Sequence, residues 1–167
     1  MHANCVFPVG NVSCPKEWPG SLVLSNAMSR DFADANPRSQ VIGVDVSPIQ
    51  PRWVPPNVEF EVDDITQEWT WQPGNFDFIY IRGLIGSIKD WKKLYREAYK
   101  CCKPGGWIES CELDLTICSD DGSVRDGMAL VALSRCVKEA GRRMGRSSKD
   151  NTAPTARVPA CPGQAGS

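Results

Sequence analysis

A run of small and β-branched residues, VIGVDVS at 41–47, constrains the fold more than any other part of the sequence. It is apolar without alternation as far as Asp45, which is typical of a strand covered on both faces in a parallel sheet. Further segments with strand character are SLVL at 21–24, VEFEVDD at 58–64, FDFIYIR at 76–82 and WIESCELDL at 107–115. The sequence therefore predicts a sheet of several strands.

Helical patterns lie between these strands. Residues 26–37, NAMSRDFADANP, have Asn26 as a candidate N-cap and Pro37 just past the end. Residues 90–102 begin at Asp90, a second candidate N-cap, and KPGG at 103–106 ends them. They place one apolar stripe along a helix: Trp91, Leu94, Tyr95, Ala98 and Cys102. Strands alternating with helices of crossover length predict a parallel α/β sheet.

The two ends of the chain differ from this central region. Residues 1–20 carry three prolines and no period, so we expect an irregular segment before a core at 21–118. Residues 119–149 read as a helical cap segment whose apolar stripe is Met128, Val131, Ala132, Cys136 and Ala140. Residues 150–167 have few large apolar side chains and predict a disordered tail.

Composition excludes several classes of protein. The 167 residues include 19 basic and 20 acidic side chains, which gives no reason to expect direct binding to nucleic acid. The only histidine is His2, so histidine-based triads and zinc sites with histidine ligands are disfavoured. The eight cysteines contain no CxxC pair, and we expect mostly reduced thiols and no metal site. No secretory signal or membrane-length apolar run is present, which predicts a cytoplasmic or nuclear location.

Three acids follow predicted strands, Asp45 after one and Asp63 and Asp64 after the next. In an open parallel sheet, ligands bind beyond the carboxyl ends of the strands. An acid in the first place can accept both hydrogen bonds of a ribose diol, and an acid in the second can accept from the adenine amine. The alternative is an acid that only ends its strand. The ordered pair, followed by the KPGG turn, favours adenosine binding.

Three longer stretches resemble a known family. They are VIGVDVSPIQPRWVPPNVEFEVDDITQEWTW, FDFIYIRGLIGSIKDW and CCKPGGWIES, and together they resemble the fungal LaeA-like methyltransferases, class I enzymes that depend on S-adenosylmethionine and are tied to secondary metabolism. The resemblance runs from about Asp31 to Ser147, and AGRRMGRS at 140–147 fits the helical region after the family's fifth strand. It implies a Rossmann-like sheet.

The resemblance also implies roles for individual residues. Asp45 would hold the ribose hydroxyls, Asp64 would accept from the adenine amine, and the Ile65 backbone would meet the ring edge. The predicted cofactor-binding set is Asp45, Val46, Ser47, Asp63, Asp64, Ile65, Arg82 and Gly83, with Asp63 as the alternative to Asp64. Glu109 and Glu112 would face the substrate side, without an assigned catalytic role.

The chain departs from the family pattern in two places. Class I methyltransferases carry a glycine-rich loop after the first strand, and no GxGxG occurs here. SLVL at 21–24 is the candidate for that first strand, which the family places between its second and fourth. The family's sixth and seventh strands have no counterpart after Ser147. We therefore expect an incomplete sheet of the class I methyltransferase type.

Three hypotheses about function follow. The first is S-adenosylmethionine-dependent methyl transfer to a small molecule or a protein in fungal secondary metabolism, with inactivity as one variant because the glycine-rich loop is absent. The second is a non-catalytic regulatory protein whose partner covers the incomplete sheet. The third, a thiol or metal protein, is disfavoured by the cysteine spacing.

Overall fold

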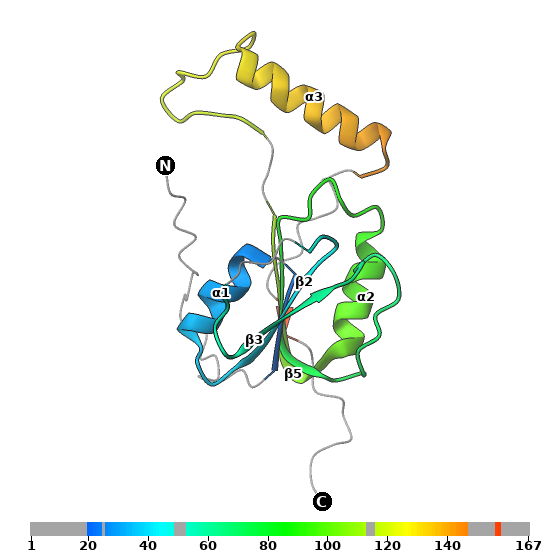
Figure 1. Ribbon diagram of the computed structural model, residues 1–167. Coiled ribbons are helices and arrows are strands. Elements are labelled where there is room, and N and C mark those ends of the chain that lie inside the picture. The colour runs from blue at the N-terminus through cyan, green and yellow to red at the C-terminus, as the bar shows by residue number, and fades with distance from the viewer. Residues whose placement is uncertain (1–19, 25, 49–52, 113–115, 147–155, 158–167) are drawn as a thin grey trace, which may run out of the picture.

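The computed structural model describes residues 20–24, 26–48, 53–112, 116–146 and 156–157 (Figure 1). Its strands are β1 (Gly20–Leu24), β2 (Gln40–Asp45), β3 (Val58–Val62), β4 (Phe76–Arg82), β5 (Cys102–Cys111) and β6 (Ala156–Arg157). Its helices are α1 (Asn26–Ala35), α2 (Trp91–Cys101) and α3 (Ala129–Arg143).

The strands form one sheet in the order β3-β2-β1-β4-β5-β6. All neighbours from β3 to β5 are parallel, as the sequence predicts. Leu22 of β1 pairs with Ile42 on one side and Ile79 on the other. The prediction that SLVL lies at the centre is therefore confirmed. Its backbone groups pair with both neighbours, so neither β2 nor β4 has an unpaired inner edge.

The last strand corrects a prediction. Ala156 and Arg157 fall in the segment predicted to be a disordered tail, and they pair antiparallel with Ile108 and Trp107 of β5. The rest of 150–167, like the predicted irregular segment at 1–19, lies outside the described residues.

The two faces of the sheet are covered by different helices, α1 on one side and α2 on the other (Figure 1). On the α2 side, the core includes Leu22, Ile79 and Ile81 from the sheet with Trp91 and Leu94 from the helix. A smaller cluster on the α1 side joins residues of α1, β2 and β4: Phe32, Ala33, Val41, Phe78 and Tyr80. Phe32 stacks on Phe78 with 5.4 Å between ring centroids.

Gly43 of β2 allows Ser29 of α1 and the Phe60 ring of β3 to lie close to the β2 backbone. A Cβ atom there would lie 2.6 Å from both the Ser29 Oγ and a ring carbon of Phe60. Asn57, just before β3, also secures the end of α1, because its side-chain amide donates to the carbonyls of Ala33 and Asn36 at 3.2 Å each. The glycine in VIGVDVS therefore serves packing.

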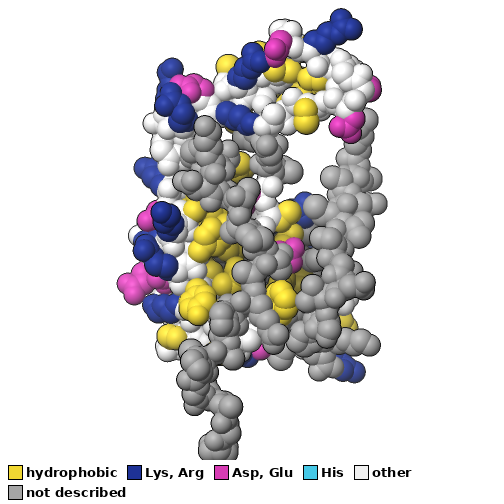
Figure 2. All heavy atoms as spheres, turned by 180° about the vertical axis from the view of Figure 1, so that it is seen from behind, with side chains coloured by type: hydrophobic (Ala, Val, Ile, Leu, Met, Phe, Trp, Pro, Cys, Tyr) yellow, Lys and Arg dark blue, Asp and Glu magenta, His cyan; other side chains and the backbone are white. Residues whose placement is uncertain are grey.

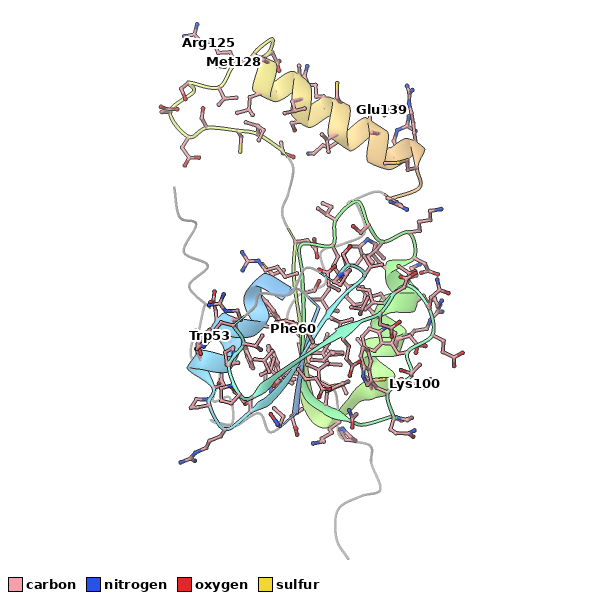
Figure 3. The ribbon with its side chains drawn as sticks, viewed as in Figure 1. Trp53, Phe60, Lys100, Arg125, Met128 and Glu139 are labelled. Atoms are coloured by element: carbon pink, nitrogen blue, oxygen red, sulfur yellow. The ribbon has the colours of Figure 1, made fainter. Side chains whose placement is uncertain are left out.

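The surface beside α1 carries a large aromatic side chain, Trp53, which Figure 3 shows next to that helix. Trp53 is exposed, and the guanidinium of Arg30 lies 5.5 Å from its ring centroid. Such cation–π contacts at exposed sites add little stability.

The connection from β3 to β4, which reads as polar in the sequence, closes the α2-side core. Trp69 is buried and meets Trp71 edge to face, and Trp71 meets Phe76 in the same way. The Trp69 indole N–H donates to the Ile65 carbonyl at 3.0 Å.

Helix α2 follows the predicted pattern at its start and on its buried face. The Asp90 carboxylate accepts from the Lys93 N–H at 2.9 Å, so the predicted N-cap is confirmed. Of the predicted stripe, Trp91, Leu94 and Ala98 are buried on the helix, and Cys102 is buried in β5. The helix ends at Cys101, and β5 already begins at Cys102. The KPGG segment is therefore part of the strand, where a Cβ on Gly106 would lie 2.7 Å from the Asp77 carbonyl.

Helix α3 is shorter than the predicted helical segment and packs differently. It begins only at Ala129, after Gly122 and Gly127 have taken positive φ angles of 69° and 95°. None of its residues is buried. The view from behind shows hydrophobic and charged side chains side by side on this segment at the top of the molecule (Figure 2). No described helix is long and apolar enough to cross a membrane.

Candidate functional site: a pocket at the strand ends

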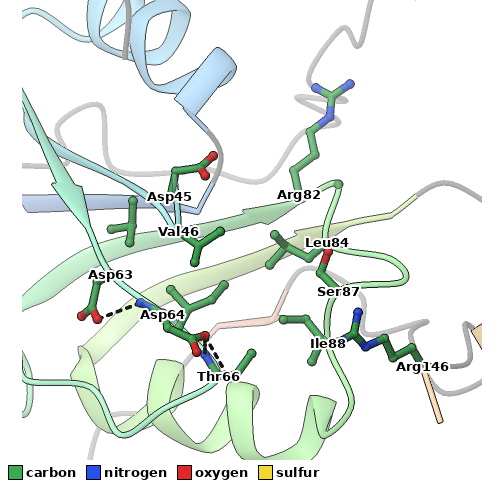
Figure 4. A pocket seen from close by; sticks show the side chains of 13 residues that line it. Asp45, Val46, Asp63, Asp64, Thr66, Arg82, Leu84, Ser87, Ile88 and Arg146 are labelled. Carbon is green, nitrogen blue, oxygen red and sulfur yellow. Dashed lines mark hydrogen bonds between the residues drawn. The ribbon is translucent and has the colours of Figure 1, made fainter. Parts of the chain in front are cut away.

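A pocket of about 470 Å³ lies where β2, β3 and β4 end (Figure 4). We call it the strand-end pocket. Its lining residues come from the carboxyl ends of these strands, from the loops that follow and from the residues after α3: Val44, Asp45, Val46, Asp63, Asp64, Ile65, Thr66, Arg82, Gly83, Leu84, Ser87, Ile88 and Arg146. This is the place where open parallel sheets bind ligands.

Asp45, the last residue of β2, is held by its own turn. One of its oxygens, Oδ1, accepts from the backbone N–H of Ser47 at 2.9 Å. No described residue is recorded as a donor to the second oxygen. Because a carboxylate accepts about four hydrogen bonds, this oxygen can still accept from a ligand hydroxyl. Ser47 does not line the pocket and acts by fixing the carboxylate.

A pair of acids, Asp63 and Asp64, follows β3. The Asp63 N–H donates to the Asp45 carbonyl at 3.1 Å, which joins the two strand ends. Asp64 accepts at Oδ1 from the N–H and hydroxyl of Thr66, at 3.0 and 2.7 Å, and at Oδ2 from Gln67. The hydrogen bonds from Thr66 hold the pKa of Asp64 below its usual value. Asp64 therefore stays ionised and shapes the loop it begins.

Two side chains of helix α2 hold the loop that follows β3. Lys93 donates its ammonium to the Thr66 carbonyl at 2.7 Å. Glu97, one turn further on, accepts from the Trp69 N–H at 3.2 Å. The loop after β3 is thus tied to α2 at two points, Thr66 and Trp69, and the other face of α2 is in the core.

The loop after β4 is fixed by Glu112, which follows β5. Its two oxygens accept from the backbone N–H groups of Leu84 and Ile85, at 3.0 and 2.9 Å. Burial raises the pKa of Glu112, while these two hydrogen bonds and the charge of Arg82 lower it. The resemblance places Glu112 on the substrate side, but the structure uses its carboxylate to hold the pocket wall.

Glu109, the other acid expected on the substrate side, lies within β5 opposite Tyr80 of β4. Burial raises the pKa of Glu109, and it raises that of Tyr80 as well. Neither residue lines the strand-end pocket. The structure gives Glu109 no contact from which a catalytic role can be argued.

The pocket is acidic at one end and basic at the other. In Figure 4, Asp45, Asp63 and Asp64 lie on one side, and Arg146 lies across the apolar side chains of Leu84 and Ile88. Val46 is apolar and 70% exposed, which suits a flat ring lying against it.

Seven of the eight predicted cofactor-binding residues line the pocket: Asp45, Val46, Asp63, Asp64, Ile65, Arg82 and Gly83. The structure brings them together, and their individual roles stay predictions. The sequence reasoning missed the other six lining residues, Val44, Thr66, Leu84, Ser87, Ile88 and Arg146. No local pattern marks Arg146. It contacts the pocket wall at Gly86, which lies 60 residues earlier in the sequence.

None of the described cysteines lines this pocket. The five described ones, Cys101, Cys102, Cys111, Cys118 and Cys136, form no disulfide among the described residues. Cys102 is buried, and burial raises its pKa to about 11, so its thiol stays protonated and unreactive. The described residues contain no cluster of metal-ligand side chains.

Most of the chain is similar to a known protein family. Residues 23–144, most of the chain, match the family described as a methyltransferase domain. The chain belongs to the methyltransferase-domain family. The match runs from the last residues of β1 to the end of α3.

The curated relatives of this methyltransferase-family chain are fungal, which confirms the resemblance. Methyltransferase pytC of Aspergillus terreus is 38% identical over 117 residues, 70% of this chain and 36% of the relative. Protein-methionine methyltransferase laeA of Emericella nidulans is 35% identical over 125 residues, 72% of this chain and 33% of the relative. The chain therefore spans about a third of the length of these relatives.

Solved structures confirm the fold. Phosphoethanolamine N-methyltransferase 2 of Haemonchus contortus, solved with phosphomonomethylethanolamine and S-adenosylhomocysteine, superposes with a TM-score of 0.52 at 24% identity. The similarity covers 65% of this chain and 28% of that one. At this identity the comparison shows the Rossmann-like fold alone.

Proposed function

We propose that the strand-end pocket binds S-adenosylmethionine through its adenosine part, and that the chain takes part in methyl transfer in fungal secondary metabolism. The observation that supports this most is the gathering of seven predicted cofactor residues around one pocket at the carboxyl ends of β2, β3 and β4. Membership of the methyltransferase-domain family and the fungal relatives support it as well.

The residues present fit the adenosine part. Asp45 has one carboxylate oxygen without a recorded donor among the described residues, and a ribose diol supplies two hydroxyl donors. Asp64 is ionised and has remaining acceptor capacity for an adenine amine. Val46 and Ile65 supply apolar surface for the ring. Arg82 and Gly83 lie at the end of β4, where the resemblance expects the methionine part.

When bound, the cofactor supplies a methyl group on a sulfonium, which is already activated for transfer. The chain's own contribution is position. Asp45 and Asp64 orient the bound molecule, and Lys93, Glu97 and Glu112 hold the two loops between which it lies. Catalysis by proximity and alignment needs no histidine, which agrees with the composition.

Binding to variants of Asp45 tests this proposal. We expect S-adenosylhomocysteine to bind the wild-type chain and Asp45→Ala to lose most of that affinity, since a charge-assisted hydrogen bond contributes about 1.5–3 kcal/mol. Asp45→Asn should lose less, because its amide oxygen still accepts one hydroxyl. Asp120→Ala, at an exposed acid outside the pocket, is the control. Equal calorimetric affinities for all four proteins would refute the proposal.

A second candidate is a non-catalytic regulatory protein that acts through a partner. The observation in its favour is the surface of α3 and its flanks, where Met128, Leu130, Leu133, Val137 and Met144 are all exposed. Such side chains in a row favour contact with another apolar surface. A monodisperse monomer in light scattering, together with methyl transfer by the isolated chain, would exclude this candidate.

The proposal includes a methyl acceptor that is either a small molecule or a protein. It also includes a cytoplasmic or nuclear location.

A further inference from the structure

One side chain that lines the strand-end pocket carries a buried polar atom without an acceptor among the described residues. The Nε of Arg146 is buried and has no hydrogen-bond acceptor among the described residues. Its side chain lines the pocket, and its Nη1 donates to the Gly86 carbonyl at 3.2 Å. Buried N–H groups of native proteins are nearly always paired, so an unpaired one inside a pocket indicates an acceptor on a ligand.

The end of α3 fixes the position of this side chain. Gly145 takes a positive φ of 67°, and its N–H donates to the Arg142 carbonyl at 3.1 Å. The N–H of Arg146 donates to the Gly141 carbonyl at 2.8 Å. This pair of bonds is a Schellman motif, which ends the helix and turns the following residue out of it. Arg146 is therefore directed to the pocket by backbone geometry.

The surroundings of Arg146 suit an anion. The acids of the pocket, Asp45, Asp63 and Asp64, lie at its other end in Figure 4, and Ile88 and Ser87 lie beside the guanidinium. No ion pair to Arg146 is recorded among the described residues, whereas its neighbours Arg142 and Arg143 are both paired with Glu139. Its charge is therefore not compensated within the described part of the chain.

We propose that Arg146 forms a carboxylate subsite at the basic end of the strand-end pocket. With Nη1 on the Gly86 carbonyl, the opposite edge of the guanidinium, Nε and Nη2, is left for a ligand, and a planar carboxylate matches that edge better than a single acceptor does. The carboxylate is either that of the cofactor's amino acid end or an acidic group of the methyl acceptor. The inference rests on the proposed function, in which adenosine occupies the acidic end.

The subsite also bears on the missing glycine-rich loop. That loop normally cradles the methionine end of the cofactor, and the chain contains no GxGxG. An arginine at the basic end gives the pocket a second point of attachment that needs no glycine-rich backbone.

Two ligands that differ only by the amino acid end separate the subsite from the adenosine site. We expect wild-type chain to bind S-adenosylhomocysteine more tightly than adenosine. If the carboxylate is the cofactor's, Arg146→Ala should weaken S-adenosylhomocysteine about tenfold or more and leave adenosine unchanged, because it removes a charge-assisted contact to the carboxylate alone. Arg143→Ala, at an exposed arginine in the last turn of α3, is the matched control and should change neither.

A direct measurement on the wild-type chain avoids dependence on the variant's folding. The Nε–H signal of Arg146, assigned by its loss in Arg146→Lys, should move downfield when a carboxylate binds, while that of Arg143 stays. A shift with S-adenosylhomocysteine assigns the carboxylate to the cofactor. A shift only with sodium acetate added to the adenosine-bound chain, and not with sodium chloride, assigns it to the acceptor.

The subsite is refuted if neither compound at saturation moves the Arg146 signal. The failure of the proposed function gives a different result: adenosine would not bind the wild-type chain. Sodium acetate added to the chain without adenosine would then still decide whether Arg146 binds carboxylates.

Discussion

Helices α2 and α3 are alike in sequence pattern and opposite in packing. Both have apolar residues along one face, yet α2 buries Trp91, Leu94, Ala98 and Cys101 and α3 buries nothing. Helix α2 is capped by the Asp90 side chain, whereas Met128 at the start of α3 makes no side-chain cap. An apolar stripe therefore predicts that a helix forms, but the partner surface decides whether the stripe is buried.

The difference extends to the candidate site. Helix α2 holds the β3 loop with Lys93 and Glu97, so the acidic end of the pocket is built on a packed helix. Arg146, which follows α3, lines the pocket and donates a hydrogen bond to the Gly86 carbonyl in the loop after β4. One end of the pocket is thus fixed by the core, and the other depends on a single side chain.

Truncating one leucine in each helix is the strongest test of this contrast. Leu94→Ala should lower the free energy of unfolding by about 2–5 kcal/mol, because Leu94 is 2% exposed and its loss leaves a cavity. Leu133→Ala should change it by less than about 0.5 kcal/mol, because Leu133 is 60% exposed. Urea unfolding followed by tryptophan fluorescence measures both. Similar losses would mean that α3 is covered in solution.

Much of the core was predictable from the sequence because local pattern and burial agree there. SLVL, VIGVDVS and FDFIYIR are apolar enough to require a central position, and Asp90 marks a helix start by its own chemistry. The ends of parallel strands converge, so the acids after β2 and β3 were expected to meet in one place.

The rest depends on contacts between distant residues. Glu112 looks like any strand acid until the loop of Leu84 and Ile85 is seen against it. Trp69 and Trp71 stand among polar residues but fill the core. The late start of α3 follows from two glycines with positive φ, and glycine alone does not reveal its φ.

A smaller effect is expected from Glu112→Gln, which tests how the core holds the pocket wall. Glutamine keeps one acceptor oxygen and replaces the other with a donor, so one of the N–H groups of Leu84 and Ile85 loses its partner. We expect a loss of about 1–3 kcal/mol, seen as faster hydrogen exchange at these two amides. Glu139→Gln on α3 should leave both amides unchanged. Unaltered exchange in Glu112→Gln would show that the wall is held by other contacts.

The smallest effects concern two glutamates whose pKa values move in opposite directions. Burial raises the pKa of Glu109 above 4.5, so the folded chain binds that proton more tightly than the unfolded chain. Its contribution to stability is full below pH 4.5 and is lost as the pH rises through the folded pKa. Hydrogen bonds from Arg142 and Arg143 lower the pKa of Glu139 to about 2, so its contribution is present above pH 4.5 and is lost as the pH falls toward 2.

Carboxyl-carbon titration by NMR should therefore find Glu109 titrating above Glu139, and Glu109→Gln should flatten the rise in stability between neutral pH and pH 4.5. The reverse order of titration would contradict the burial of Glu109 in the sheet.

The central claim is that adenosine binds where β2, β3 and β4 end, and amide shifts in an NMR titration with adenosine test it most directly. The account predicts the largest shifts at Ser47, Thr66 and Ile85, whose N–H groups donate to Asp45, Asp64 and Glu112. The amides of α3 should stay unchanged, because adenosine leaves the basic end empty of carboxylate. Shifts centred on α3, or none at saturating adenosine, would contradict the account.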